Sequence, residues 1–261
     1  MFIDSHCHFN FACFNTNRKL LMSQLIDSNI SHIVIPGTDA KRWAEIIKLA
    51  ENNHNIYFSL GIHPHFLRDF DEQDLTYLKE LLLLTRQQTN SKCVALGEIG
   101  LDKLIETDLI QQEAIFLAQL ALAQSLKLPV ILHIVKTQSR VLALLKQSKF
   151  NCGGIYHAFS GSEEIANEFI KLGFKLGVGG VITYPNSTKT KQTISRLPLN
   201  SLVLETDAPD MPIYKQNTLN NSPLNLKIIF NELCKLRKEP IDVIERELYL
   251  NCQSIFSIIN D

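Results

Sequence analysis

Histidines and acidic residues recur in this 261-residue chain at the ends of short apolar runs, where a metal site would need them. Six of the eight histidines and two carboxylates are placed in this way: His6, His8, His63, His65, Glu98, His133, His157 and Asp207. His6 and His8 are separated by one residue, Cys7. Alternation along a strand therefore puts both imidazoles on one face and Cys7 on the other. Buried charges without partners cost several kcal/mol, and a bound divalent cation removes that cost. The pattern therefore predicts a metal site.

The elements that must position these residues alternate between two kinds of hydrophobic pattern. Short strand-like runs cover residues 2–6, 32–35, 56–60, 93–96, 130–133, 154–157, 175–178 and 202–205. Amphipathic helix-like segments cover residues 18–28, 40–52, 74–88, 108–126, 139–149, 162–172, 190–196, 223–236 and 241–250, with a final short apolar helix. This alternation favours parallel strands with right-handed crossovers. The length predicts one α/β domain over 1–261, a (β/α)8 TIM barrel.

A doubly wound open sheet is the structural alternative, but no GxGxxG follows an early strand. In a barrel, the carboxyl ends of the strands carry the chemistry, so the histidines and acids would meet at one rim. Taken singly, Glu98 could cap a loop and Asp207 could pair with an Arg or Lys. Their convergence favours metal binding instead. His32 and His54 lie elsewhere and are expected to be surface or capping imidazoles.

Composition excludes several classes of protein. The 26 basic and 27 acidic residues leave a net charge of −1, which excludes a wholesale basic nucleic-acid coat and favours a monomer. The start, MFIDSHCHF, does not read as a secretory signal. The longest purely apolar run covers only 81–84, far short of the ~20 residues of a membrane span. The six cysteines form no CxxC pair and are expected to be reduced thiols. We therefore expect a cytoplasmic protein without a membrane partner.

Seven segments together resemble the TatD-type metal-dependent hydrolases, a branch of the amidohydrolase-like barrels. The segments are FIDSHCHF, GIHPH, LGEIGLD, PVILH, HAFSGS, GVGGVITYP and LETDAPD. They follow the family's order and spacing from Phe2 to Asp210. The GVGGVITYP segment and the run LPLNSLVLETDAPDMP are similar to the YjjV-like subgroup, whose members are mostly uncharacterised hydrolases.

The resemblance implies a site with two divalent metal cations. It assigns one metal to His6, His8, Glu98 and Asp207, and the other to Glu98, His133 and His157. Glu98 would bridge, because a carboxylate has two oxygens and can span metals ~3.5–4 Å apart. Four imidazoles among six ligands favour Zn, Mn, Ni or Co over Mg. Family members often work with Mg, so the identity of the metal stays open.

The resemblance also implies roles toward the substrate. His63 and His65 would contact a substrate phosphate, with His65 the firmer assignment. Asp207 would ligate a metal and accept the proton of the attacking water. Many relatives carry Arg where this chain has Val135, so Lys136 or Arg140 would have to supply the positive charge there.

The leading interpretation is a phosphodiesterase that acts on DNA ends, an exonuclease-like deoxyribonuclease, or on small phosphodiesters. The alternatives are an amide, lactone or ester hydrolase, and a non-enzymatic scaffold that only holds metal. Lys189, Lys191 and Arg196 would either follow a single strand or form a solvated helix face. Phe159 and Tyr184 would either stack on a base or pack against neighbouring loops.

Overall fold

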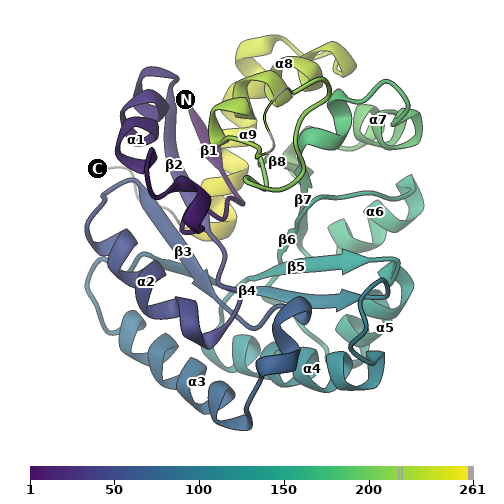
Figure 1. Cartoon of the computed structure of the whole chain (residues 1–261). Coiled ribbons are helices and arrows are strands. Elements are labelled where there is room, and N and C mark those ends of the chain that lie inside the picture. Colours follow the sequence, from purple (N-terminus) through teal and green to yellow (C-terminus); the bar gives the residue numbers. More distant parts are fainter. Residues whose placement is uncertain (217, 219, 258–261) are drawn as a thin grey trace.

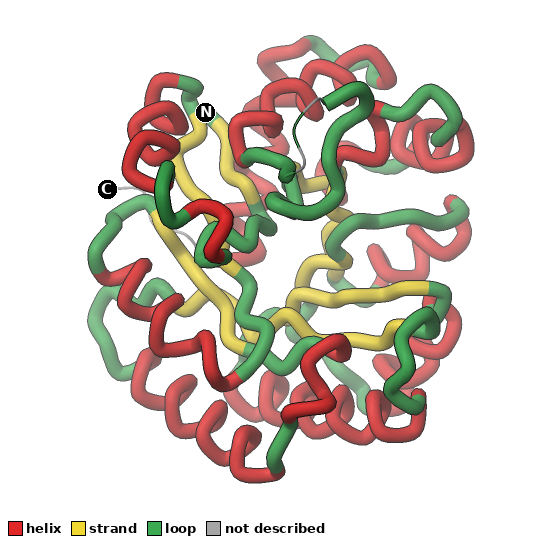
Figure 2. Tube along the Cα trace, viewed as in Figure 1, coloured by secondary structure: helices red, strands yellow, loops and turns green. Residues whose placement is uncertain are grey.

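The computed structural model describes residues 1–216, 218 and 220–257 and contains one sheet of eight parallel strands in chain order (Figure 1). The strands are β1 (Phe2–Asp4), β2 (Ile30–Ile35), β3 (Ile56–Leu60), β4 (Cys93–Asp102), β5 (Val130–Val135), β6 (Gly154–Tyr156), β7 (Phe174–Val178) and β8 (Leu202–Leu204). The helices are α1 (Arg18–Asp27), α2 (Ala40–Glu51), α3 (Glu72–Arg86), α4 (Leu109–Leu126), α5 (Gln138–Gln147), α6 (Glu163–Lys171), α7 (Thr188–Arg196), α8 (Leu226–Leu236) and α9 (Ile241–Phe256). Figure 2 shows the strands inside a ring of helices.

β1 and β8 bring the two ends of the sheet together. The Ser5 N–H donates to the carbonyl of Leu204 at 3.0 Å. The Thr206 hydroxyl and N–H donate to the buried carboxylate of Asp4 at 2.6 and 3.0 Å. These contacts make a nearly closed barrel, so the predicted (β/α)8 fold is confirmed.

Two apolar layers hold the barrel. The larger lies between the strands and the surrounding helices. The smaller fills the interior with one or two side chains from most strands and with two from α9: Ile3, Val34, Tyr57, Val94, Ala95, Ile131, Ile155, Val203, Cys252 and Phe256. α9 packs at the amino ends of the strands, away from the predicted metal site, because the amide of Asn251 donates to the carbonyls of Leu199, which precedes β8, and of Leu202, the first residue of β8. Among the residues that the structure describes, none of the helices has the length and apolar character to cross a bilayer.

Several strand ends differ from the prediction, and the difference matters for the site. β1, β6 and β8 end two, one and one residues earlier than predicted, so His6, His157 and Asp207 stand on the segments that follow the strands. β4 instead runs on to Asp102 and pairs with β5 along this extension. After a shift of register between Leu96 and Ile99, β4 resumes its pairing with β5 from Ile99 to Asp102, an irregularity that the sequence pattern does not reveal.

The predicted end of the last helical segment at 250 is wrong. α9 continues through Leu248, Cys252 and Phe256, which are buried at a four-residue spacing. Asn251 donates from its amide to the carbonyls of Leu199 and Leu202 at 2.9 and 2.8 Å. Those tertiary contacts satisfy the polar side chain inside the helix. The final helix that was predicted after 250 is therefore part of α9 up to Phe256, and residues 258–261 lie outside the described residues.

Candidate metal centre

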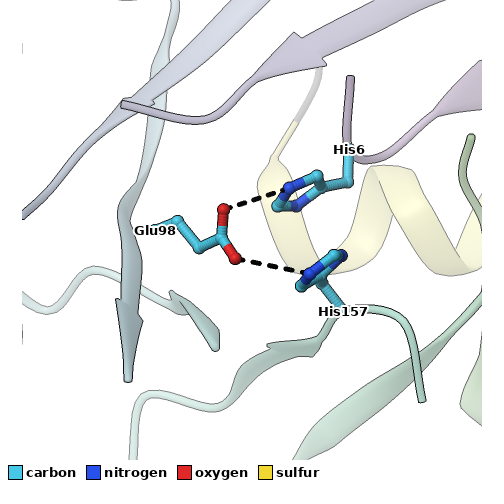
Figure 3. Close-up of side chains that lie close together, drawn as sticks. All are labelled: His6, Glu98 and His157. Carbon is cyan, nitrogen blue, oxygen red and sulfur yellow. Dashed lines mark ion pairs between the residues drawn. The ribbon is translucent and has the colours of Figure 1, made fainter. Parts of the chain in front are cut away.

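Glu98 on β4 lies at the middle of the histidine cluster and is 1% exposed. Its Oε2 is 3.2 Å from Nε2 of His6, and its Oε1 is 3.3 Å from Nε2 of His157. Figure 3 shows the two carboxylate oxygens directed at the two imidazoles, which come from the segments after β1 and β6. The carboxylate therefore has one oxygen available to each of two groups of ligands.

The group around Oε2 contains His6, His8 and Asp207. Nε2 of His8 is 3.7 Å from Oε2 of Glu98, and the Nε2 atoms of His6 and His8 are 3.4 and 3.6 Å from Oδ1 of Asp207. Asp207 adopts a left-handed backbone conformation with φ of 57°, which Asp tolerates better than most residues. Its N–H donates to the carbonyl of His6 at 2.8 Å, which fixes these two side chains relative to each other.

The group around Oε1 contains His133 and His63 in addition to His157. Nδ1 of His133 is 3.0 Å away and Nε2 of His63 is 3.4 Å away. Gly100 permits this arrangement, because a Cβ at that position would lie 1.8 Å from the carbonyl oxygen of His133. The two neighbouring strands can approach closely only with glycine there.

The donor set fits a divalent metal ion. Three combinations of these residues bring ligand atoms within 4.8 Å of one another: His6 with Glu98 and His157, His6 with His8 and Asp207, and His63 with Glu98 and His133. Among the described residues, ten buried side-chain polar atoms lack a hydrogen-bond partner, and six of them belong to His6, His8, Glu98, His157 and Glu205. Mixed imidazole and carboxylate ligands suit borderline metals such as Zn. Two of these six atoms, Nε2 of His6 and Oε2 of Glu98, face each other at the centre of the cluster, where a bound cation would satisfy both.

The charges of the cluster are strongly coupled. Burial alone would raise the pKa of Glu98, but the imidazoles of His63, His6 and His157 lower that pKa well below its usual range. Burial alone would lower the pKa of His157, yet Glu98, Asp207 and Glu205 raise it to about 10. Burial raises the pKa of Asp207 to about 6 against the lowering effect of His157 and His6. A metal must therefore compete with a proton on His157.

Two further carboxylates hold the imidazoles from behind, and sequence reasoning gave them no role. Oδ2 of Asp102 is 3.1 Å from Nε2 of His133 and 2.8 Å from Nε2 of His65. Because Nε2 of His133 faces Asp102, its Nδ1 is left to face Glu98. Ligating histidines commonly use their second nitrogen in this way. The only signal in the sequence was the position of Asp102 at the end of LGEIGLD.

Glu205 is the second of these carboxylates and is fully buried beneath His157. Its Oε1 accepts a hydrogen bond from the Ala158 N–H and lies 3.5 Å from Nδ1 of His157. Gly177 on β7 leaves the space for it, since a Cβ there would lie 2.2 Å from Oε2 of Glu205. Gly177 therefore makes room for a carboxylate at the end of the neighbouring strand.

A neutral His63 has its tautomer fixed by the backbone. Its Nδ1 accepts a hydrogen bond from the N–H of His65 at 3.1 Å. Burial lowers the pKa of His63 to about 4, so the ring is neutral at neutral pH. The remaining proton must lie on Nε2, directed toward Glu98 and the centre of the site. His63 is thus a hydrogen-bond donor inside the cluster, whereas His65 is exposed at its edge.

A cavity of about 520 Å³ opens onto this cluster. Lys136 and Val135 both line the cavity, together with Phe11, Phe66 and Met211. Arg140 pairs with Glu113 through two hydrogen bonds of 2.6 and 2.5 Å, so its charge is already partnered.

Some predicted or considered residues lie outside the cluster. Phe159 is fully buried and packs edge-on against Tyr156, so it cannot stack on a base. The Tyr184 hydroxyl donates to the carbonyl of Pro212 at 2.8 Å. His54 is exposed, as expected for a surface residue. The Cys7 thiol is buried and faces the carbonyl of Ala208, in agreement with the predicted orientation away from the site.

Comparison with known proteins agrees with this geometry. A family model described as TatD related DNase matches residues 3–257. The chain belongs to the TatD family. An uncharacterized metal-dependent hydrolase of Escherichia coli K12, YjjV, is 39% identical over 258 residues, which is 98% of each chain. An uncharacterized metal-dependent hydrolase of Bacillus subtilis, YabD, is 30% identical over 99% of this chain and 100% of its own.

The crystal structure of E. coli YjjV, described as a TatD homolog, matches with a TM-score of 0.93 at 38% identity, over 99% of this chain and 98% of that chain. The resemblance inferred from the seven motifs is therefore confirmed. The chain is a metal-dependent hydrolase of the TatD family, and its candidate ligands are those that surround Glu98.

Proposed function

We propose that this TatD-family hydrolase is a phosphodiesterase that removes nucleotides from DNA ends with the help of two divalent cations. The observation that carries the proposal is the position of Glu98. Each of its carboxylate oxygens faces a different group of imidazoles at 3.0–3.7 Å. A bridging carboxylate is what a two-metal site requires, and paired metals suit the displacement of an oxygen at phosphorus.

We assign six residues as metal ligands from this geometry and the family resemblance. His6, His8 and Asp207 would hold one cation with Oε2 of Glu98. His133 and His157 would hold the other with Oε1. His63 also reaches Oε1, but its Nε2 carries the proton in the neutral ring, so we assign it as a donor rather than a ligand.

The residues around the ligands suit hydrolysis. When bound, the cations would polarise a substrate oxygen and lower the pKa of water. Asp207, whose pKa of about 6 leaves it ionised at neutral pH, would accept the proton of the attacking water. The Nε2–H of His63 would donate to an oxygen of the phosphodiester. His65 and Lys136, at the wall of the cavity, would add donors for the same group.

The test is removal and replacement of the metal. The purified protein is stripped with a chelator, and Zn, Mn, Ni, Co and Mg are added back singly. Nucleotide release is then measured from single-stranded and duplex DNA, beside bis(p-nitrophenyl) phosphate and simple lactones. We expect no turnover without metal and release of nucleotides after replacement. Activity that survives complete stripping would contradict the metal mechanism. Lactone, ester or amide turnover without any nucleotide release would favour the alternative hydrolase class.

A further inference from the structure

Two phenyl rings form a wall of the cavity that the metal chemistry does not use. Phe11 lies in the segment after β1, and Phe66 lies in the short 3-10 helix Pro64–Asp69 after β3. Both rings are partly exposed and line the same cavity as Glu98 and Asp207. Arg42, at the start of α2, lies between them, with Cζ 4.8 Å from the ring centre of Phe66 and 5.8 Å from that of Phe11. We call Phe11 and Phe66 the aromatic wall, and Arg42 is not among the residues that line the cavity.

The charge of Arg42 is already matched. Its guanidinium forms an ion pair with Asp39, a carboxylate that is 8% exposed. Asp39 also accepts hydrogen bonds from the Lys41 N–H at 3.1 Å and from the Thr38 hydroxyl at 2.9 Å. A guanidinium that is paired at its edge and covered on its faces by rings is a poor clamp for a phosphate. The rings line the cavity and the guanidinium does not, so the wall offers the substrate apolar ring surface rather than free positive charge.

The loop that carries Phe11 is also fixed in place. Arg18 donates hydrogen bonds to the carbonyls of Phe9, Asn10 and Phe11 at 3.0, 3.1 and 3.4 Å. Phe11 stacks on the imidazole of His8, with ring centres 4.7 Å apart and an angle of 24° between planes. A wall held by these contacts binds a flat group with little loss of conformational entropy.

The wall begins at the metal cluster. Phe11 stacks on His8, whose Nε2 is 3.6 Å from Oδ1 of Asp207. The ring centres of His63 and Phe66 are 6.0 Å apart. A planar group on the wall would thus lie beside the bond that is cleaved.

We propose that Phe11 and Phe66 bind, by stacking, the nucleobase of the nucleotide at the scissile phosphodiester. This inference rests on the proposed phosphodiesterase function and specifies its substrate. Stacking on aromatic side chains tolerates any sequence, because every base has a π-face. The aromatic wall therefore makes the enzyme select nucleotides over simple aliphatic phosphodiesters without selecting a particular base.

The experiment compares a short single-stranded oligonucleotide with the same oligonucleotide carrying an abasic residue at one end, with each end tested in turn. The metal-loaded wild-type protein is compared with the double variant Phe11→Leu and Phe66→Leu, which keeps apolar side chains but removes both rings. Tyr77→Leu is the matched control, because it removes a ring that is 40% exposed on α3 and does not line the cavity. Metal content and melting temperature are measured for every protein.

We expect the wild-type kcat/KM to be roughly ten- to a hundredfold higher for the base-bearing end than for the abasic end. The double variant should lose most of that preference through a higher KM for the base-bearing substrate, and Tyr77→Leu should keep it. An unchanged preference in the double variant, or an equal loss on both substrates, would overturn the stacking role. Turnover of neither oligonucleotide by the wild type would instead refute the proposed phosphodiesterase.

Arg42→Met separates stacking from charge. If the wall acts through its rings, the variant should turn over the abasic substrate at close to the wild-type rate, since Arg42 does not hold the phosphate. An equal loss on both substrates would show that Arg42 binds the phosphate, and the proposal would then be wrong.

Discussion

At the amino ends of the strands the barrel interior is filled with apolar side chains, whereas at the carboxyl ends it holds imidazoles and carboxylates. The apolar end includes Tyr57, Val94 and Phe256, which belong to one buried cluster that joins several strands to α9. At the polar end, His6 leaves both ring nitrogens and Glu98 leaves one oxygen without a hydrogen-bond partner among the described residues. Packing alone satisfies the first end, whereas at the second end a bound cation would satisfy Nε2 of His6 and Oε2 of Glu98.

This difference assigns separate tasks to the two ends of one barrel. Burial of apolar surface contributes about 25 cal/mol per Å², and it does so without any ligand. Unpaired buried polar atoms lower the stability of the folded state. A cation that binds these atoms only in the folded state raises that stability. We therefore expect substitutions at the polar end to affect activity and metal binding, and substitutions at the apolar end to affect stability.

The largest expected effect follows from Glu98→Gln. The amide keeps the size of the side chain but cannot serve as an anionic bridge, so we expect kcat/KM to fall by about a thousandfold or more. The chelator-treated variant should still unfold in one cooperative transition, as measured by circular dichroism in urea. A variant with the wild-type rate would mean that a different site or a contaminant carries the activity.

Phe256→Ala tests the opposite end. The ring is 2% exposed inside the apolar cluster, so its removal should lower the free energy of unfolding by about 3–5 kcal/mol. The metal affinity and kcat/KM of the folded variant should stay within about twofold of the wild type. Loss of metal binding in a variant that is still folded would show that the two ends are coupled more tightly than their separate packing indicates.

Gly177→Ala probes the boundary between the two ends. The added Cβ would lie 2.2 Å from Oε2 of Glu205, so the carboxylate behind His157 must move. Loss of such a supporting group commonly weakens metal binding by about ten- to a hundredfold, which titration calorimetry would measure.

Gly179→Ala is the matched control for that experiment. A Cβ at Gly179 would lie 3.5 Å from Oε1 of Glu205, which is ordinary van der Waals contact. We expect this variant to bind metal like the wild type. Equal weakening by both substitutions would mean that the backbone of this segment, rather than Glu205, determines the affinity.

The same contrast explains what the sequence could predict. The barrel and the convergence of His6, Glu98 and Asp207 follow from strand periodicity and from the rule that parallel strands present their carboxyl ends on one side. Alternation also indicated that Cys7 turns away from His6. These inferences need only the spacing of residues along single strands.

The supporting contacts could not be predicted in that way. The role of Asp102 depends on which nitrogen of His133 faces it, and that in turn depends on the register shift between β4 and β5. Glu205 depends on an empty volume at Gly177 on the neighbouring strand. Asn251 continues α9 through hydrogen bonds to a segment 49 and 52 residues away. Each is a relation between elements that local pattern does not encode.

The smallest expected effect is a contribution of His157 to the pH dependence of stability that only the metal-free protein shows. The carboxylates around His157 raise its pKa to about 10, above the ordinary value of 6.5, so between these values the folded state holds a proton that the unfolded state has lost. Stability from this group is complete below pH 6.5 and declines as pH rises, by up to about 1.4 kcal/mol per unit. With saturating metal, His157 is a deprotonated ligand and this slope should vanish. Urea unfolding between pH 7 and 8.5, with and without metal, would measure the two slopes. Groups remote from the cluster, such as the buried Cys93, contribute equally to both slopes and cancel in the difference between them. Identical slopes in both states would mean that His157 holds no such proton, and that the polar end of the barrel is less strongly coupled than its geometry implies.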